Sequence, residues 1–144
     1  MSQQSRQSSR AATPPAIAVA IGSGGALGSC ARYALGRSIP TAHQGFPWST
    51  YLINTAGSFA LALLVISLVE VWRPTRYQHP FWVVGFIGSF TTFSTAVVET
   101  DLLFAHNFGV GVVYLLVSVL SGFFAAGLGL VLGRTLAATA GTPR

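Results

Sequence analysis

Four long apolar stretches occupy most of the 144-residue chain and constrain its fold more than any other feature. They run roughly over residues 16–35, 51–71, 81–104 and 108–132. Each is close to the ~20 residues that a helix needs to cross a ~30 Å hydrocarbon core. Only 8% of the residues are charged and 51% are hydrophobic, which would cover a soluble protein of this size with apolar surface. The sequence therefore predicts an all-α membrane protein with four transmembrane helices.

The chain is long enough for one small domain, which we place at residues 16–134. Residues 1–15 are rich in Ser and Gln and are predicted to be a disordered tail, and residues 135–144 form a C-terminal tail. Arg6 and Arg10 before an apolar run resemble a signal peptide, but three further spans favour a permanent first helix. The connections between spans are hairpin-length, so neighbouring helices should be antiparallel.

The net charge of +5 comes from eight arginines, and lysine is absent. Because the arginines flank the apolar stretches, they suit lipid headgroups better than nucleic acid, and no nucleic-acid partner is expected. With four crossings, the two tails and the second loop share one side of the membrane and hold six arginines, against Arg32 and Arg37 near the other side. Arginine-rich loops and tails of membrane proteins tend to lie on the cytoplasmic side, so both termini are predicted to be cytoplasmic.

Polar and small residues line one face of the second span. Thr50, Asn54, Gly57 and Ser58 fall at i, i+4, i+7 and i+8 of a helix. An amide such as that of Asn54 is costly in hydrocarbon unless its donors and acceptors are used. This face must therefore either pack against another helix or line a hydrated path, and the pattern leaves both open.

The third span contains a segment that is a poor helix for the middle of a membrane. Residues 85–95 read GFIGSFTTFST, in which glycine and hydroxyl side chains crowd together. Such residues can bond to nearby backbone and permit unusual dihedral angles. We predict a break here that exposes carbonyl and amide groups, which survive in a membrane only inside protein or beside a cavity. The alternative is an intact helix whose hydroxyls bond back onto its own turns.

The fourth span carries Tyr114, Ser118 and Ser121 at i, i+4 and i+7, a line of hydroxyls along one face. Close packing of helices is predicted at three pairs of small residues four apart, which are Gly24 with Gly28, Ser118 with Gly122, and Gly129 with Gly133. Four helices can hardly enclose both a core and a pore, so self-association or a partner subunit is expected.

Taken together, these residues closely resemble the CrcB/Fluc family of fluoride channels, over about residues 16–134. The resemblance rests on the following motifs: Gly25-Ala26-Leu27-Gly28 with Arg32-Tyr33, Thr50-Tyr51-Leu52-Ile53-Asn54 with Gly57-Ser58-Phe59, Gly88-Ser89-Phe90-Thr91-Thr92-Phe93-Ser94-Thr95 with Glu99, and Tyr114 with Ser118. The Thr-Thr-Phe-Ser-Thr element combined with Asn54 is its most specific part.

The resemblance implies an antiparallel dimer of four-helix subunits in the bacterial inner membrane, with two fluoride pathways and no enzymatic activity. It also implies one structural sodium ion (Na+), held by the backbone carbonyls of Gly88 and Thr91 at the break. The residues that it assigns to the fluoride pathway are Thr50, Asn54, Phe93, Ser94, Thr95, Tyr114 and Ser118, and it places Arg32 near a vestibule. The implied function is passive export of cytoplasmic fluoride, which relieves its toxicity.

These residue types suit the chemistry of fluoride. The ion is small and strongly hydrated, so passage requires donors that replace water without a fixed positive charge strong enough to trap the ion. Amide and hydroxyl groups meet that need, and the edge of an aromatic ring carries partial positive charge that can contact an anion.

The chain departs from the family pattern at two positions that bear on assembly. The family usually has a second phenylalanine three residues after the first, where this chain has Ala96, and often a second serine where it has Gly122. The missing ring motivates the hypothesis that the chain pairs with an oppositely oriented paralogue. A homodimer, a heterodimer and a half-competent or non-conducting subunit all remain open.

Two other classes fit less well. A small proton-coupled multidrug transporter would be expected to carry an acidic residue within its first helix, and the first span of this sequence has none. Glu99 is the best candidate for a proton or cation role, although a solvated carboxylate at the interface is the commoner arrangement. A serine hydrolase would have to pair Ser94 with His106, which twelve helical residues separate by about 18 Å.

Overall fold

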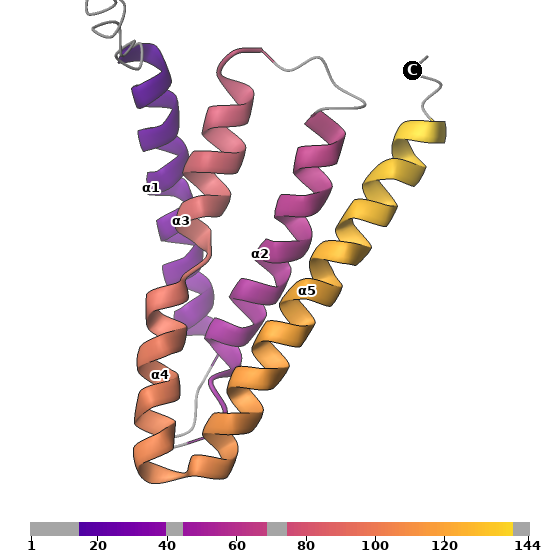
Figure 1. Ribbon diagram of the computed structural model, residues 1–144. Helices are drawn as coiled ribbons and strands as arrows, with labels where there is room; N and C mark the ends of the chain where they lie inside the picture. The colour runs from indigo at the N-terminus through magenta and orange to yellow at the C-terminus, as the bar shows by residue number, and fades with distance from the viewer. Residues whose placement is uncertain (1–14, 40–44, 69–74, 140–144) are drawn as a thin grey trace, which may run out of the picture.

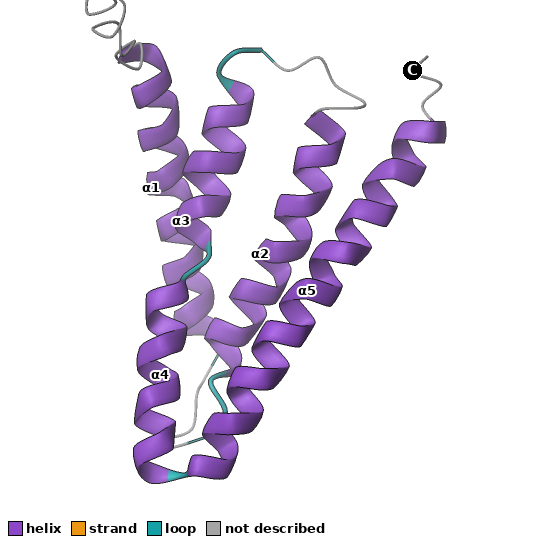
Figure 2. Cartoon of the chain, viewed as in Figure 1, coloured by secondary structure: helices purple, strands orange, loops and turns teal. Residues whose placement is uncertain are grey.

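The computed structural model describes residues 15–39, 45–68 and 75–139, and every regular element within these ranges is a helix (Figure 2). The predicted N-terminal tail lies outside the described residues except for Pro15. Glu70, Arg73 and Arg144 lie outside them as well. The elements are α1 (Pro15–Ser38), α2 (Trp48–Ile66), η3 (Pro80–Ile87), α3 (Gly88–Phe90), α4 (Phe93–His106) and α5 (Phe108–Thr139). Of these, η3 is wound as a π-helix, and α5 runs past Arg134 into the predicted C-terminal tail.

Successive spans run in opposite directions, with η3, α3 and α4 together forming the third, and the helices form two pairs that diverge toward one end of the molecule (Figure 1). In one pair α1 packs along η3 and α3, and in the other α2 packs along α5. Beyond the break, α4 leaves α1 and packs against α5. The start of α1 and the end of α5 lie at the same end of the bundle (Figure 1). The predicted antiparallel arrangement of neighbouring helices is therefore confirmed.

Three helical segments of the described chain are long and apolar enough to cross a membrane. They are Trp48–Ile66, Pro80–His106 and Phe108–Thr139, which correspond to the second, third and fourth predicted spans. The first predicted span also forms a helix, the 24-residue α1, but glycine and serine make it less apolar than the others. The chain is thus an all-helical, multi-pass membrane protein.

Glycines allow the helices of each pair to approach closely. A Cβ on Gly24 or Gly28 of α1 would overlap the backbone oxygen of Phe81 or Phe86. On α5, a Cβ on Gly129 would lie 2.5 Å from the backbone oxygen of Phe59. The predicted close packing is confirmed at the two glycine pairs, Gly24 with Gly28 and Gly129 with Gly133.

The third pair behaves differently. A Cβ on Gly122 would meet nothing closer than the Ser58 hydroxyl at 3.7 Å, which is an ordinary van der Waals distance. The helices approach within van der Waals reach at Gly122, as predicted, but less tightly than at the two glycine pairs. Alanine would fit there, and the hydroxyl of the neighbouring Ser121 lies 3.3 Å from that of Thr55 on α2.

Few side chains are buried, as expected for a chain whose outer surface is covered by lipid or by another subunit. Tyr114 and Leu68 are the most deeply buried large side chains among the described residues, each 1% exposed. Phe123 and Phe124 on α5 are 77% and 78% exposed. The apolar surface therefore faces outward, and the polar groups gather between the helices.

Candidate functional site

The third span is broken between α3 and α4. Thr91 and Thr92 leave the helical conformation, with ψ of 158° at Thr91 and φ of −146° at Thr92. Thr92 then caps α4, because its hydroxyl oxygen accepts a hydrogen bond from the backbone N–H of Thr95 at 3.2 Å. The predicted break is confirmed, and the alternative of an intact helix is wrong.

Asn54 of α2 holds the break in place. Its amide nitrogen donates to the Thr92 carbonyl, and its amide oxygen accepts from the Thr92 N–H, both at 2.8 Å. One turn along α2, Gly57 leaves room for the methyl group of Thr91, which occupies the place that a Cβ would take. The polar face of the second span thus packs against irregular backbone, whose polar groups would otherwise lack partners.

The same contact changes the bonding of Gly88. In a continuous helix the Thr92 N–H would donate to the Gly88 carbonyl, but here it donates to Asn54. The preceding N–H, that of Thr91, donates to Ile87 at 3.1 Å. The break therefore removes the regular helical donor from the Gly88 carbonyl.

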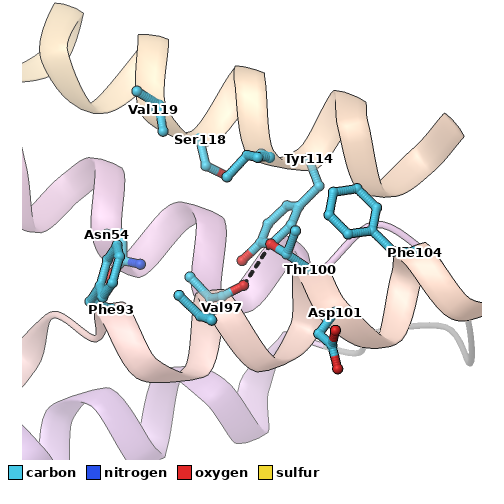
Figure 3. A pocket seen from close by; sticks show the side chains of 11 residues that line it. Asn54, Phe93, Val97, Thr100, Asp101, Phe104, Tyr114, Ser118 and Val119 are labelled. Carbon is cyan, nitrogen blue, oxygen red and sulfur yellow. Dashed lines mark hydrogen bonds between the residues drawn. The ribbon is translucent and has the colours of Figure 1, made fainter. Parts of the chain in front are cut away.

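A cavity of about 420 Å³ lies between α4 and α5, next to Asn54 of α2 (Figure 3). Its walls carry rings, aliphatic side chains and a few neutral polar groups, with one carboxylate, that of Asp101, and no arginine or histidine. The lining residues are Asn54, Phe93, Ala96, Val97, Thr100, Asp101, Phe104, Tyr114, Leu115, Ser118 and Val119.

Two neutral donors in this cavity are available to a ligand. The hydroxyl oxygen of Ser118 is buried and has no hydrogen-bond partner among the described residues. Asn54 uses one of its two amide hydrogens on Thr92 and retains the other. By contrast, the hydroxyl of Thr100 is occupied, because it donates to the Ala96 carbonyl at 2.7 Å.

Glu99 sits behind this cavity and joins three helices. One carboxylate oxygen accepts from the hydroxyl of Thr50 on α2 at 2.8 Å, and the other accepts from the hydroxyl of Tyr114 on α5 at 2.9 Å. The carboxylate is therefore held by hydroxyls of other helices, which corrects the picture of a solvated interfacial acid. Thr50 lies one turn before Asn54 and Glu99 two turns after Thr92, but neither span alone shows that the two side chains meet.

A second cavity of about 280 Å³ lies beside the break. It is lined by Asn54, Gly57, Ser58, Leu61, Thr91, Thr92 and Phe93. Phe93 lines both cavities and is 85% exposed at the start of α4. Its ring therefore stands at the outer wall of the site.

The remaining predicted site residues lie further from the cavities. Ser94 and Thr95 are exposed in the first turn of α4 and line neither cavity, although the Thr92 hydroxyl donates to that of Thr95 at 2.9 Å. Arg32 is half-buried on α1 and also lines neither cavity. Among the described residues, no group of three His, Cys, Asp or Glu side chains could hold a metal ion.

Antiparallel apolar helices, a broken span and neutral donors facing a cavity define a small membrane transport protein. Comparison with known proteins agrees, because residues 19–130 match the family model described as CrcB-like protein, Camphor Resistance (CrcB). The chain belongs to the CrcB/FluC family.

Three relatives illustrate the similarity. Over 82% of its length the chain is 48% identical to fluoride-specific ion channel FluC 3 of Streptomyces avermitilis, and it spans 58% of that longer protein. It is 38% identical to FluC 2 of Nocardia farcinica over 88% of this chain and 80% of the relative. It is 36% identical to FluC of Hydrogenovibrio crunogenus over 81% of this chain and 89% of the relative. These relatives are named as ion channels, which confirms the expectation that the chain is not an enzyme.

Proposed function

We propose that the chain forms a passive, fluoride-selective channel that lets fluoride leave the cytoplasm. The observation that carries the proposal is the cavity between α4 and α5, which is lined by Ser118, whose hydroxyl has no partner among the described residues, and by Asn54, which has a free amide hydrogen, with no basic side chain in the wall. Neutral donors replace the water around a small anion without trapping it. The names of the relatives support the same ion.

The pathway runs from the break toward the end of the bundle where α4 meets α5. Asn54 and Phe93 begin it, with the ring edge of Phe93 as a weak partner for an anion. Ser118 and Tyr114 continue it along α5. Thr50 acts indirectly, because its hydroxyl donates a hydrogen bond to Glu99 and does not reach the cavity. Ser94 and Thr95, in the first turn of α4, would reach the ion only from the exposed side.

A structural sodium ion at the break is part of the same proposal. Carbonyl oxygens suit a hard cation, and the Gly88 carbonyl has lost its helical donor to Asn54. Thr91, the residue after α3, has an extended backbone conformation, so its carbonyl is not bound within a helix. Gly88 and Thr91 are therefore the residues that would hold the ion, whose charge would draw anions toward the site.

We further propose an antiparallel dimer that crosses the bacterial inner membrane four times per subunit, with Arg32 near a vestibule. Arg76, which precedes η3, and Arg134, late in α5, belong to the end of the bundle that holds the start of α1 (Figure 1). Arg37 belongs to the other end. With Arg73 and the arginines of the two tails, this distribution favours cytoplasmic termini. Membrane lipid then contacts the exposed apolar side chains.

One specific observation favours a half-competent subunit as a second candidate. Ala96 lines the main cavity where the family usually carries a second ring, so a phenylalanine of the partner would have to supply that edge. If the missing ring limits conduction, Ala96→Phe should raise fluoride flux, and Ala96→Leu, which adds bulk without a polar edge, should not. Equal or lower flux through Ala96→Phe would remove this candidate.

Fluoride efflux from liposomes that contain the purified chain tests the proposed function. A fluoride electrode should record efflux well above that of empty liposomes, and a chloride electrode should record none above background. The measurement is repeated with a co-expressed homologue, since an obligate heterodimer conducts only then. If neither preparation releases fluoride faster than empty vesicles, the proposed function is wrong.

A further inference from the structure

A phenylalanine outside the cavity packs directly on one of its walls. Phe46 lies in the short segment before α2, and its ring contacts three others. Trp48 and Tyr51 are its neighbours in sequence, with ring centroids at 4.6 Å and 5.4 Å. The third ring is that of Tyr114 on α5, at 5.2 Å and an interplanar angle of 89°. Phe46 therefore links the segment before α2 to α5 by an edge-to-face contact.

The ring on which Phe46 packs is fixed at its other end by Glu99. Tyr114 is 1% exposed, and its hydroxyl donates to Glu99 at 2.9 Å. The second oxygen of Glu99 accepts from Thr50 at 2.8 Å. Two hydroxyls thus share the charge of a carboxylate that sits next to the proposed path of an anion. If the carboxylate lost one of these donors, less of its negative charge would be offset by hydroxyl dipoles, and it would repel the anion more strongly.

We propose that Phe46 is a positioning residue for conduction, which acts through Tyr114 and not through contact with the ion. By packing on the Tyr114 ring, Phe46 holds the phenol hydroxyl on Glu99 and keeps this carboxylate satisfied and turned from the cavity. Without Phe46, space opens beside the ring, Tyr114 can swing, and Glu99 loses a donor. This inference rests on the proposed fluoride conduction.

The test compares fluoride efflux from liposomes for Phe46→Ala in two backgrounds. In the otherwise unchanged chain, Phe46→Ala should lower efflux about tenfold. In Tyr114→Phe, which keeps the ring but lacks the hydroxyl, adding Phe46→Ala should lower efflux less than twofold further, because the interaction that Phe46 supports is already absent. Phe46→Leu, which fills space without a ring edge, should be intermediate.

Trp48→Ala is the matched control. Trp48 contacts Phe46 and Tyr51, is 52% exposed, and makes no ring contact with Tyr114 within the described part of the chain. Its efflux should stay within twofold of the unchanged chain. Gel filtration and thermal unfolding verify that each variant is folded, and if Phe46→Ala is not recovered, Phe46→Leu alone and with Tyr114→Phe carries the same comparison.

The outcomes separate the inference from the proposed function. If the unchanged chain, with its homologue where required, releases no fluoride, the proposed function fails. If it conducts and the Phe46 substitution lowers efflux by the same factor in both backgrounds, Phe46 has a merely structural role and the inference is wrong. Efflux unaffected by the Phe46 substitution overturns the inference as well.

Discussion

Replacing Asn54 tests the central physical relation in this structure, which is that a side chain of one helix stabilises the break in another. Asn54→Ala removes two hydrogen bonds of 2.8 Å and leaves both backbone groups of Thr92 without those partners. A typical bond contributes about 1 kcal/mol net, and each buried group left unpaired costs about 1–3 kcal/mol. Bonds between helices in membranes average nearer ~0.6 kcal/mol. We expect a loss of about 2–4 kcal/mol in the free energy of unfolding.

The measurement is thermal unfolding of the purified protein in detergent. By the usual scaling with chain length, this loss lowers the unfolding temperature by roughly 5–12 °C. Asn54→Asp should be at least as harmful, because a carboxylate that accepts from the Thr92 N–H places its second charged oxygen against the Thr92 carbonyl with no proton between them. Ser58→Ala is the control, since among the described residues the Ser58 hydroxyl bonds only to a carbonyl of its own helix, that of Asn54, at 2.9 Å. If Asn54→Ala unfolds within about 1 °C of the unchanged chain, the bracing argument is refuted.

Three further substitutions each test one local feature of the structure. Gly28→Ala should destabilise the chain by about 1–3 kcal/mol, because the new Cβ would overlap the Phe86 backbone oxygen, whereas Gly22→Ala, with nothing within 4 Å, should be neutral or slightly stabilising in the same unfolding measurement. Ser118→Ala should lower fluoride efflux several-fold and leave the unfolding temperature unchanged, since the hydroxyl has no hydrogen bond to lose within residues 15–39, 45–68 and 75–139. Asp101→Asn, which removes a negative charge from the exposed rim of the cavity, should raise efflux at low ionic strength, with a gain that shrinks as salt is added; a gain independent of salt would contradict this electrostatic cause.

The sequence predicts the helices and the position of the break well, because both depend on local properties. The apolar stretches set the number of spans, and the short connections between them set their antiparallel directions. The GSFTTFST run places residues that disfavour a helix around Thr91 and Thr92. The glycines Gly24 and Gly28 also predict close packing of the first helix, because two glycines on one face allow another helix to approach. This prediction does not require knowing which helix packs there. Periodicity of this kind carries information along one helix at a time.

What the sequence does not predict are contacts that depend on how several helices are rotated relative to one another. The bonds from Thr50 and Tyr114 to Glu99 join three helices, and no single span shows the pattern. The contact of Phe46 with Tyr114 joins residues that are far apart in the chain. The looser contact at Gly122 has the same origin, because two small residues four apart show a possible surface and not how tightly a partner covers it.

The geometry also determines which substitutions can separate conduction from stability. Asn54 both braces the break and presents a hydrogen to the cavity, so loss of efflux in an Asn54 variant has two physical causes at once. The hydroxyl of Ser118 has no hydrogen bond within the described chain, so loss of efflux without loss of stability must come from a missing donor to the ion. The two positions line the same cavity. Efflux and unfolding are therefore measured for variants at both positions. The Ser118 variant shows how much efflux is lost when only a donor to the ion is removed, and any further loss in the Asn54 variant reflects the weakened break.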